Sequence, residues 1–135
     1  MMKRAIYLKC ILLVSLVILS FTGKITLKGT WEFKGGIYNG KKEGPPKEYI
    51  LQRKYDNAHF EAFATDSSNR PEKYEAGDYV LKGDTCIETE TYSSQPSKLT
   101  GVPISYSYSI RNDTLTLMAT LPSGMTTQEY WKKSK

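Results

Sequence analysis

The chain has 135 residues, which is enough for one domain with a single hydrophobic core. Lysine and arginine outnumber aspartate and glutamate by 19 to 14, but three of the basic residues lie within the first nine positions. The others are scattered among acidic residues. This argues against a nucleic-acid-binding protein, because such proteins gather positive charge on one face.

The N-terminal segment, residues 1–23, is typical of a secretion signal. Its basic start precedes an uncharged apolar run over residues 11–21, which ends at small residues. A membrane-spanning helix needs about 20 apolar residues, roughly twice this length. We therefore expect export, to the periplasm or out of the cell, of a folded domain over residues 24–135. Because no A-x-A cleavage motif is present, an uncleaved N-terminal anchor is the alternative, and it would be the one membrane attachment we expect.

From residue 28 onward the composition favours β-structure. Tyr, Thr, Ile and Val are frequent, and Gly, Pro, Asn and Asp divide the chain into short runs. We find no convincing helical period. The sequence predicts eight strands, over residues 29–34, 48–55, 59–64, 74–81, 85–92, 102–111, 114–121 and 125–132.

Alternation is clearest between residues 102 and 111, where apolar residues at every second position are separated by serines. The apolar set is Ile104, Tyr106, Tyr108 and Ile110. The next predicted strand repeats the pattern with leucines and threonines. One face of each strand therefore meets a core and the other meets water, as in the wall of a barrel or sandwich.

The predicted links alternate in length. Short links at 56–57, 82–84 and 112–113 suit tight hairpin turns, whereas 35–47, 65–73 and 93–101 are longer and 122–124 is compact. In an up-and-down barrel alternate links lie at opposite ends. We therefore expect one end closed by turns and one open mouth bordered by loops.

Several short motifs occur in a characteristic order. G-T-W at residues 29–31 opens the first strand, G-D-Y at 77–79 starts a hairpin, and E-Y-W-K at 129–132 closes the last strand. In this order and spacing, nearly all of residues 24–135 resembles the secreted bacterial lipocalin-like domains of uncharacterised function. The resemblance implies an all-β, eight-stranded antiparallel up-and-down barrel with Trp31 plugging its closed end. Cys86 departs from the family pattern, which has an aromatic residue there, and Lys132 or Lys133 stands where an arginine often packs on the tryptophan.

The interior of such a barrel is either filled by side chains or just wide enough for one small ligand. Aromatic residues of the presumed inner face line either a ligand site or a plain core, together with a few charged residues. The candidate ligand-binding residues are Trp31, Phe33, Tyr49, Arg53, Tyr79, Glu88, Tyr106, Tyr108, Glu129 and Trp131.

Arg53 has two possible environments. An isolated buried charge is costly, so an inward Arg53 is expected to meet Glu88 or Glu129 inside the barrel. The alternatives are a solvated surface pair, or the opposite facing of the strand, with Ile50 and Gln52 inside.

Nothing in the sequence predicts an enzyme. His59 is the single histidine, which excludes a His-rich metal site, and we find no nucleophile elbow, phosphate loop or zinc-protease motif. We expect no cofactor and no metal. Cys86, the single cysteine of the domain, is interpreted as a small strand residue.

Two hypotheses for function follow. The leading one is non-catalytic binding of a small apolar or amphipathic molecule in the barrel, outside the cytoplasm. The alternative is a solid-core interaction or structural module that contacts a protein or glycan through its long loops. A hydrolase or isomerase comes third.

Overall fold

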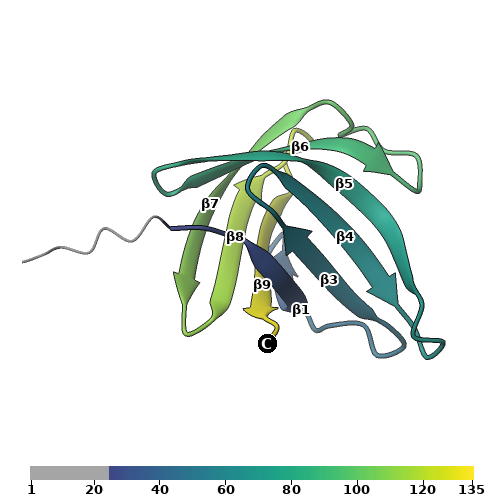
Figure 1. Cartoon of the computed structure of the whole chain (residues 1–135). Coiled ribbons are helices and arrows are strands. Elements are labelled where there is room, and N and C mark those ends of the chain that lie inside the picture. Colours follow the sequence, from purple (N-terminus) through teal and green to yellow (C-terminus); the bar gives the residue numbers. More distant parts are fainter. Residues whose placement is uncertain (1–24) are drawn as a thin grey trace, which may run out of the picture.

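A computed structural model describes residues 25–135, and the predicted signal segment 1–23 lies outside this range. The described residues form one antiparallel sheet (Figure 1). Its strands are β1 (Gly29–Tyr38), β2 (Lys41–Glu43), β3 (Ile50–Tyr55), β4 (His59–Thr65), β5 (Pro71–Lys82), β6 (Thr85–Ser93), β7 (Pro103–Arg111), β8 (Thr114–Thr120) and β9 (Thr126–Lys133). Among residues 25–135 no helix is long and apolar enough to span a membrane.

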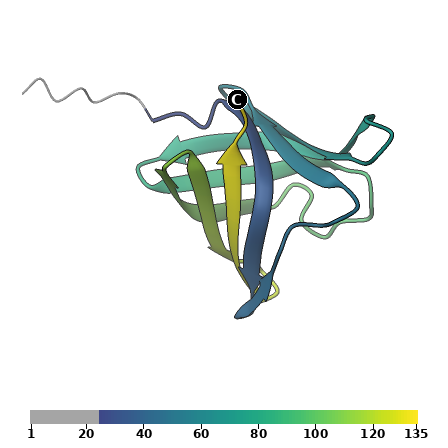
Figure 2. The ribbon, with the colours of Figure 1, turned by 90° about the horizontal axis from the view of Figure 1, so that it is seen from below.

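The sheet closes on itself. Each strand from β3 to β9 pairs with its neighbour in sequence, and β1 pairs with both β3 and β9. Figure 2 shows β1 and β9 side by side, and their register runs from Trp31 opposite Lys133 to Tyr38 opposite Thr127. Strand β2 pairs only with the far end of β1, so the barrel wall has eight strands. The predicted all-β meander barrel is confirmed.

The first predicted link, residues 35–47, is partly strand. The chain continues as β1 to Tyr38, turns at Asn39-Gly40, and returns as β2. Both turn residues have positive φ, as a two-residue hairpin turn requires. Gly35 follows a β-bulge in the pairing with β9, and a Cβ on Gly36 would lie 2.9 Å from the Gln128 carbonyl oxygen. The glycines that suggested a loop therefore mark a bulge and a close strand approach.

The closed end of the barrel is solid. Leu27, in the coil before β1, is fully buried, and its carbonyl oxygen accepts a 2.8 Å hydrogen bond from Trp31 Nε1. The three tight turns after β3, β5 and β7 lie at this end. Tyr79 donates its hydroxyl hydrogen to the Asp56 carbonyl, and Tyr108 donates to the Gly83 carbonyl at 2.9 Å. Two tyrosine hydroxyls are thus used to fix turns at the closed end.

The opposite end carries the longer links, as the alternation of link lengths predicts. These join β2 to β3, β4 to β5 and β6 to β7, while a short turn joins β8 to β9. This end is the mouth of the barrel, and the interior just beneath it is where a site would lie.

Candidate functional site in the barrel interior

The centre of the barrel holds a buried ion pair. Arg53 of β3 and Glu88 of β6 are only 5% and 4% exposed, and Arg53 Nη2 lies 2.8 Å from Glu88 Oε1. The other Glu88 oxygen accepts a 2.8 Å hydrogen bond from the Tyr55 hydroxyl. Arg53 and Tyr55 point inward together because strand residues two apart share a face. The structure therefore selects the inward Arg53 over a solvated surface pair, with Glu88 as its partner.

Aromatic rings surround the guanidinium group of Arg53. Its Cζ lies 4.4 Å from the Phe60 ring centroid, 5.4 Å from that of Tyr55 and 5.6 Å from that of Trp131. These distances suit cation–π attraction. Burial alone would lower the pKa of Arg53, but Glu88 and its other neighbours raise the pKa well above the ordinary value. The Arg53 guanidinium therefore stays positively charged and is surrounded by three aromatic rings.

A second polar layer lies nearer the mouth. Glu75 of β5 is 3.4 Å from Arg53 Nη2. Burial raises the pKa of Glu75, and the negative charges of Glu88, Glu90 and Glu129 add to this effect although Arg53 opposes it. The Glu75 carboxyl group is therefore harder to ionise than one in water.

Hydroxyl groups hold the other two carboxylates of the interior. Glu129 of β9 accepts a 2.7 Å hydrogen bond from the Tyr38 hydroxyl, and Glu90 of β6 accepts one of 2.7 Å from Thr100. Burial also raises the pKa of Tyr74 to about 12 and raises that of Tyr106, so both phenols stay protonated at neutral pH. The layer combines carboxylates with neutral hydroxyl donors.

A small hollow of about 70 Å³ opens within this layer. Its lining is mixed, because it combines three carboxylates with apolar and aromatic groups. The lining residues are Phe60, Glu75, Glu88, Glu90, Leu99, Val102, Ile104 and Tyr106.

The ten predicted site residues fall into two groups. Trp31, Tyr79 and Tyr108 pack at the closed end, where their polar atoms bond to main-chain carbonyls. Phe33 packs against Trp131, with ring centroids 5.1 Å apart.

The other members lie in the middle of the barrel or towards its mouth. Arg53, Glu88 and Trp131 form the central cluster, Tyr106 lines the hollow, Glu129 lies beside Tyr38, and Tyr49 is 43% exposed near the mouth. The structure thus brings about half of the predicted set together in one polar interior.

Sequence reasoning missed four residues of this interior: Tyr38, Tyr74, Glu75 and Glu90. The alternation pattern could have found Glu75. It lies four residues before Tyr79, which was predicted to face inward, and strand residues an even number of positions apart share a face. Tyr38 was hidden by the assignment of residues 35–47 to a loop. Tyr74 lies where β5 shifts its register against β4, and no alternation pattern shows such a shift.

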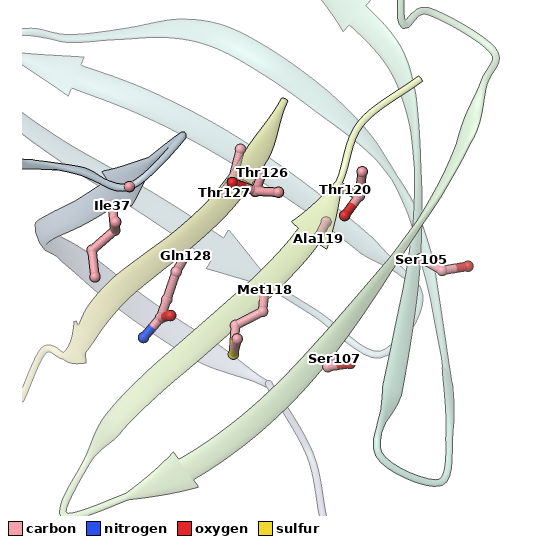
Figure 3. Close-up of a pocket in the computed structure, with 10 residues that line it drawn as sticks. Ile37, Ser105, Ser107, Met118, Ala119, Thr120, Thr126, Thr127 and Gln128 are labelled. Carbon is pink, nitrogen blue, oxygen red and sulfur yellow. The ribbon is translucent and has the colours of Figure 1, made fainter. Parts of the chain in front are cut away.

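Wider but shallower grooves lie elsewhere on the described surface. One of about 480 Å³ crosses the outer face of β7, β8, β9 and β1 (Figure 3). Ser107, Met118 and Gln128 point into it from successive strands. Two others, of about 710 and 560 Å³, flank the coil around Ile25 at the closed end. These grooves lack the buried charges and matched hydrogen bonds of the interior, so we take the interior as the candidate site.

Comparisons with known proteins identify the fold. An uncharacterized protein from Bacteroides eggerthii DSM 20697 matches with a TM-score of 0.60 and 17% identity, over 81% of this chain and 100% of that one. A lipocalin-like protein from Bacteroides uniformis ATCC 8492 matches with a TM-score of 0.56 and 18% identity, over 80% and 98% of the two chains. No family model matches the sequence, and no curated protein does. The barrel is lipocalin-like in its fold, as the order of short motifs indicated.

Proposed function

We propose that the protein binds a small amphipathic molecule at the mouth of its barrel, outside the cytoplasm, without transforming it chemically. The observation that supports this most is the unevenly filled interior. The closed half is packed with aromatic side chains, whereas the half near the mouth holds carboxylates and tyrosines around a hollow of about 70 Å³. Ligand pockets typically combine apolar walls with a few placed polar groups, and this hollow has both.

The size of the hollow limits how a ligand would enter. One water molecule takes up about 30 Å³ in the liquid, so the hollow has room for a head group and not for a whole ligand. The apolar remainder of the molecule would lie against Leu99 and Val102, which are half-buried at the rim. A ligand of this kind is amphipathic because its two ends meet different surroundings.

The experiment is native mass spectrometry of protein purified from an exporting host. We expect an adduct of low mass that denaturation releases. Val102→Trp should fill the hollow and remove the adduct, whereas Ser107→Trp, which places the same side chain in the outer groove, should leave it. Absence of an adduct from the parent protein, or its loss only in Ser107→Trp, would contradict the proposal.

A second candidate function is supported by the outer groove. This depression has about 480 Å³ and is lined by uncharged side chains such as Ile37, Met118 and Gln128. Exposed or half-buried apolar side chains such as Met118 and Ile37 favour contact with another macromolecule where they lie together on a surface. In this case the barrel would be an interaction module, and Ser107→Trp would be the variant that disturbs its function.

A further inference from the structure

The interior near the mouth carries more negative than positive charge. Four carboxylates lie there, and three of them raise the pKa of the fourth, Glu75, by their negative charge. The three are Glu88, Glu90 and Glu129. Among residues 25–135, Arg53 is the one cation placed between these carboxylates. Arg53 is matched by Glu88 at 2.8 Å and Glu75 at 3.4 Å. Two carboxylates are therefore left without a cationic partner in the described part of the chain.

These two carboxylates are held by neutral donors instead. Glu129 is bonded by the Tyr38 hydroxyl and Glu90 by the Thr100 hydroxyl. A cleft with walls of low dielectric constant and one excess sign of charge concentrates ions of the opposite sign. The chemistry of the site thus favours a positively charged molecule over a neutral or anionic one.

The aromatic rings around Arg53 show how this interior accommodates a cation. The guanidinium lies over the Phe60 ring at 4.4 Å, and Phe60 also lines the hollow beside Glu75 and Glu90. A second cation in the hollow would meet carboxylates and the apolar or aromatic surfaces of Ile104 and Tyr106. Cation–π attraction grows when the cation is removed from water, as it would be here.

We infer that the ligand is a small organic cation, an amine whose ammonium group enters the hollow beside Glu75 and Glu90 while its apolar part lies at the mouth. This inference rests on the proposed function and specifies the class of molecule bound there. The hollow of about 70 Å³ accepts an ammonium or short alkylammonium head. A carboxylate head in the same place would face three glutamates.

The test is isothermal titration calorimetry at low ionic strength with hexylamine, 1-hexanol and hexanoate, which share one apolar body and differ in charge. We expect hexylamine to bind at least about tenfold more tightly than 1-hexanol, and hexanoate to bind most weakly. Equal affinities would overturn the inference that the ligand is a cation, while the proposed binding function would stand. If no member of the series binds, both proposals fail.

Glu90→Gln provides the matched variant, because Glu90 is not paired with Arg53 and its removal spares the central ion pair. We expect hexylamine affinity to fall about tenfold while 1-hexanol affinity is kept, which also shows that the barrel is folded. Glu61→Gln removes the same charge from the outer face, where Glu61 lies 3.4 Å from Lys73, and should change affinity less than twofold. An unchanged hexylamine affinity in Glu90→Gln would overturn the inference.

Discussion

Replacing Glu88 by Gln should destabilise the barrel strongly, because it removes the charge that compensates Arg53. Glu88 is 4% exposed and accepts hydrogen bonds of 2.8 Å from both Arg53 and Tyr55. Gln keeps the size of the side chain, so the change isolates charge and hydrogen bonding from packing. Breaking a buried ion pair by removing one partner costs about 3–5 kcal/mol.

The structure places the expected value at the lower end of that range. Glu75 remains 3.4 Å from Arg53 and compensates part of the positive charge. We therefore expect the free energy of unfolding to fall by about 3 kcal/mol, which for a domain of this size lowers Tm by roughly 10–15 °C. Urea denaturation followed by tryptophan fluorescence gives the first quantity and calorimetry the second.

A double-mutant cycle separates the ion pair from other effects. Arg53→Met alone should also destabilise, whereas Arg53→Met combined with Glu88→Leu should recover much of the loss, because replacing both charges by apolar groups removes the unpaired ion. The control is Glu61→Gln on the outer face, where an exposed pair contributes about 0–1 kcal/mol. If Glu88→Gln changed stability no more than Glu61→Gln does, the buried-pair interpretation would be refuted.

Three further changes probe other parts of the account. Gly77→Ala should cost about 2 kcal/mol in urea denaturation, because the new Cβ would lie 2.2 Å from the Thr89 carbonyl oxygen; a change below about 0.5 kcal/mol would show that the strands can separate there. Burial raises the pKa of the Cys86 thiol, so in a Cys10→Ser chain Cys86 should stay unreactive towards a disulfide reagent until guanidinium unfolds the protein, and rapid native labelling would be inconsistent with its burial. The raised pKa of Glu75 means that its contribution to stability is complete below the ordinary pKa of 4.5 and is lost as pH rises through the folded value. Stability of the parent minus that of Glu75→Gln should therefore decline as pH rises above 4.5, and an increase would contradict the sign.

The sequence predicted the architecture well because the barrel follows from local patterns. Alternation at Tyr106 and Tyr108 fixed the inner face of β7, and the order of the short and long links identified the two ends. The resemblance to lipocalin-like domains, carried in part by the motif at residues 29–31, implied that Trp31 plugs the closed end, where its indole bonds to the Leu27 carbonyl. These features depend on neighbours in the chain, which a pattern can show.

The composition of the site was harder to predict, because it depends on register between strands. Arg53 faces Glu88 across the barrel, and the sequence offered Glu129 as an equal partner. Tyr38 was assigned to a loop, since Gly35 and Gly36 resemble turn residues and their role in the bulge depends on β9. The direction of Tyr108 was predicted, but its hydroxyl is bound to Gly83 at the closed end and takes no part in the hollow.

Mapping of bound hexylamine by heteronuclear NMR tests the central claim most directly. If small molecules enter the barrel at its mouth, the amide signals of Glu90, Val102 and Tyr106 should shift most, with the side-chain indole signal of Trp131 following. Shifts centred on Met118 and Gln128 would place binding in the outer groove and contradict a site inside the barrel.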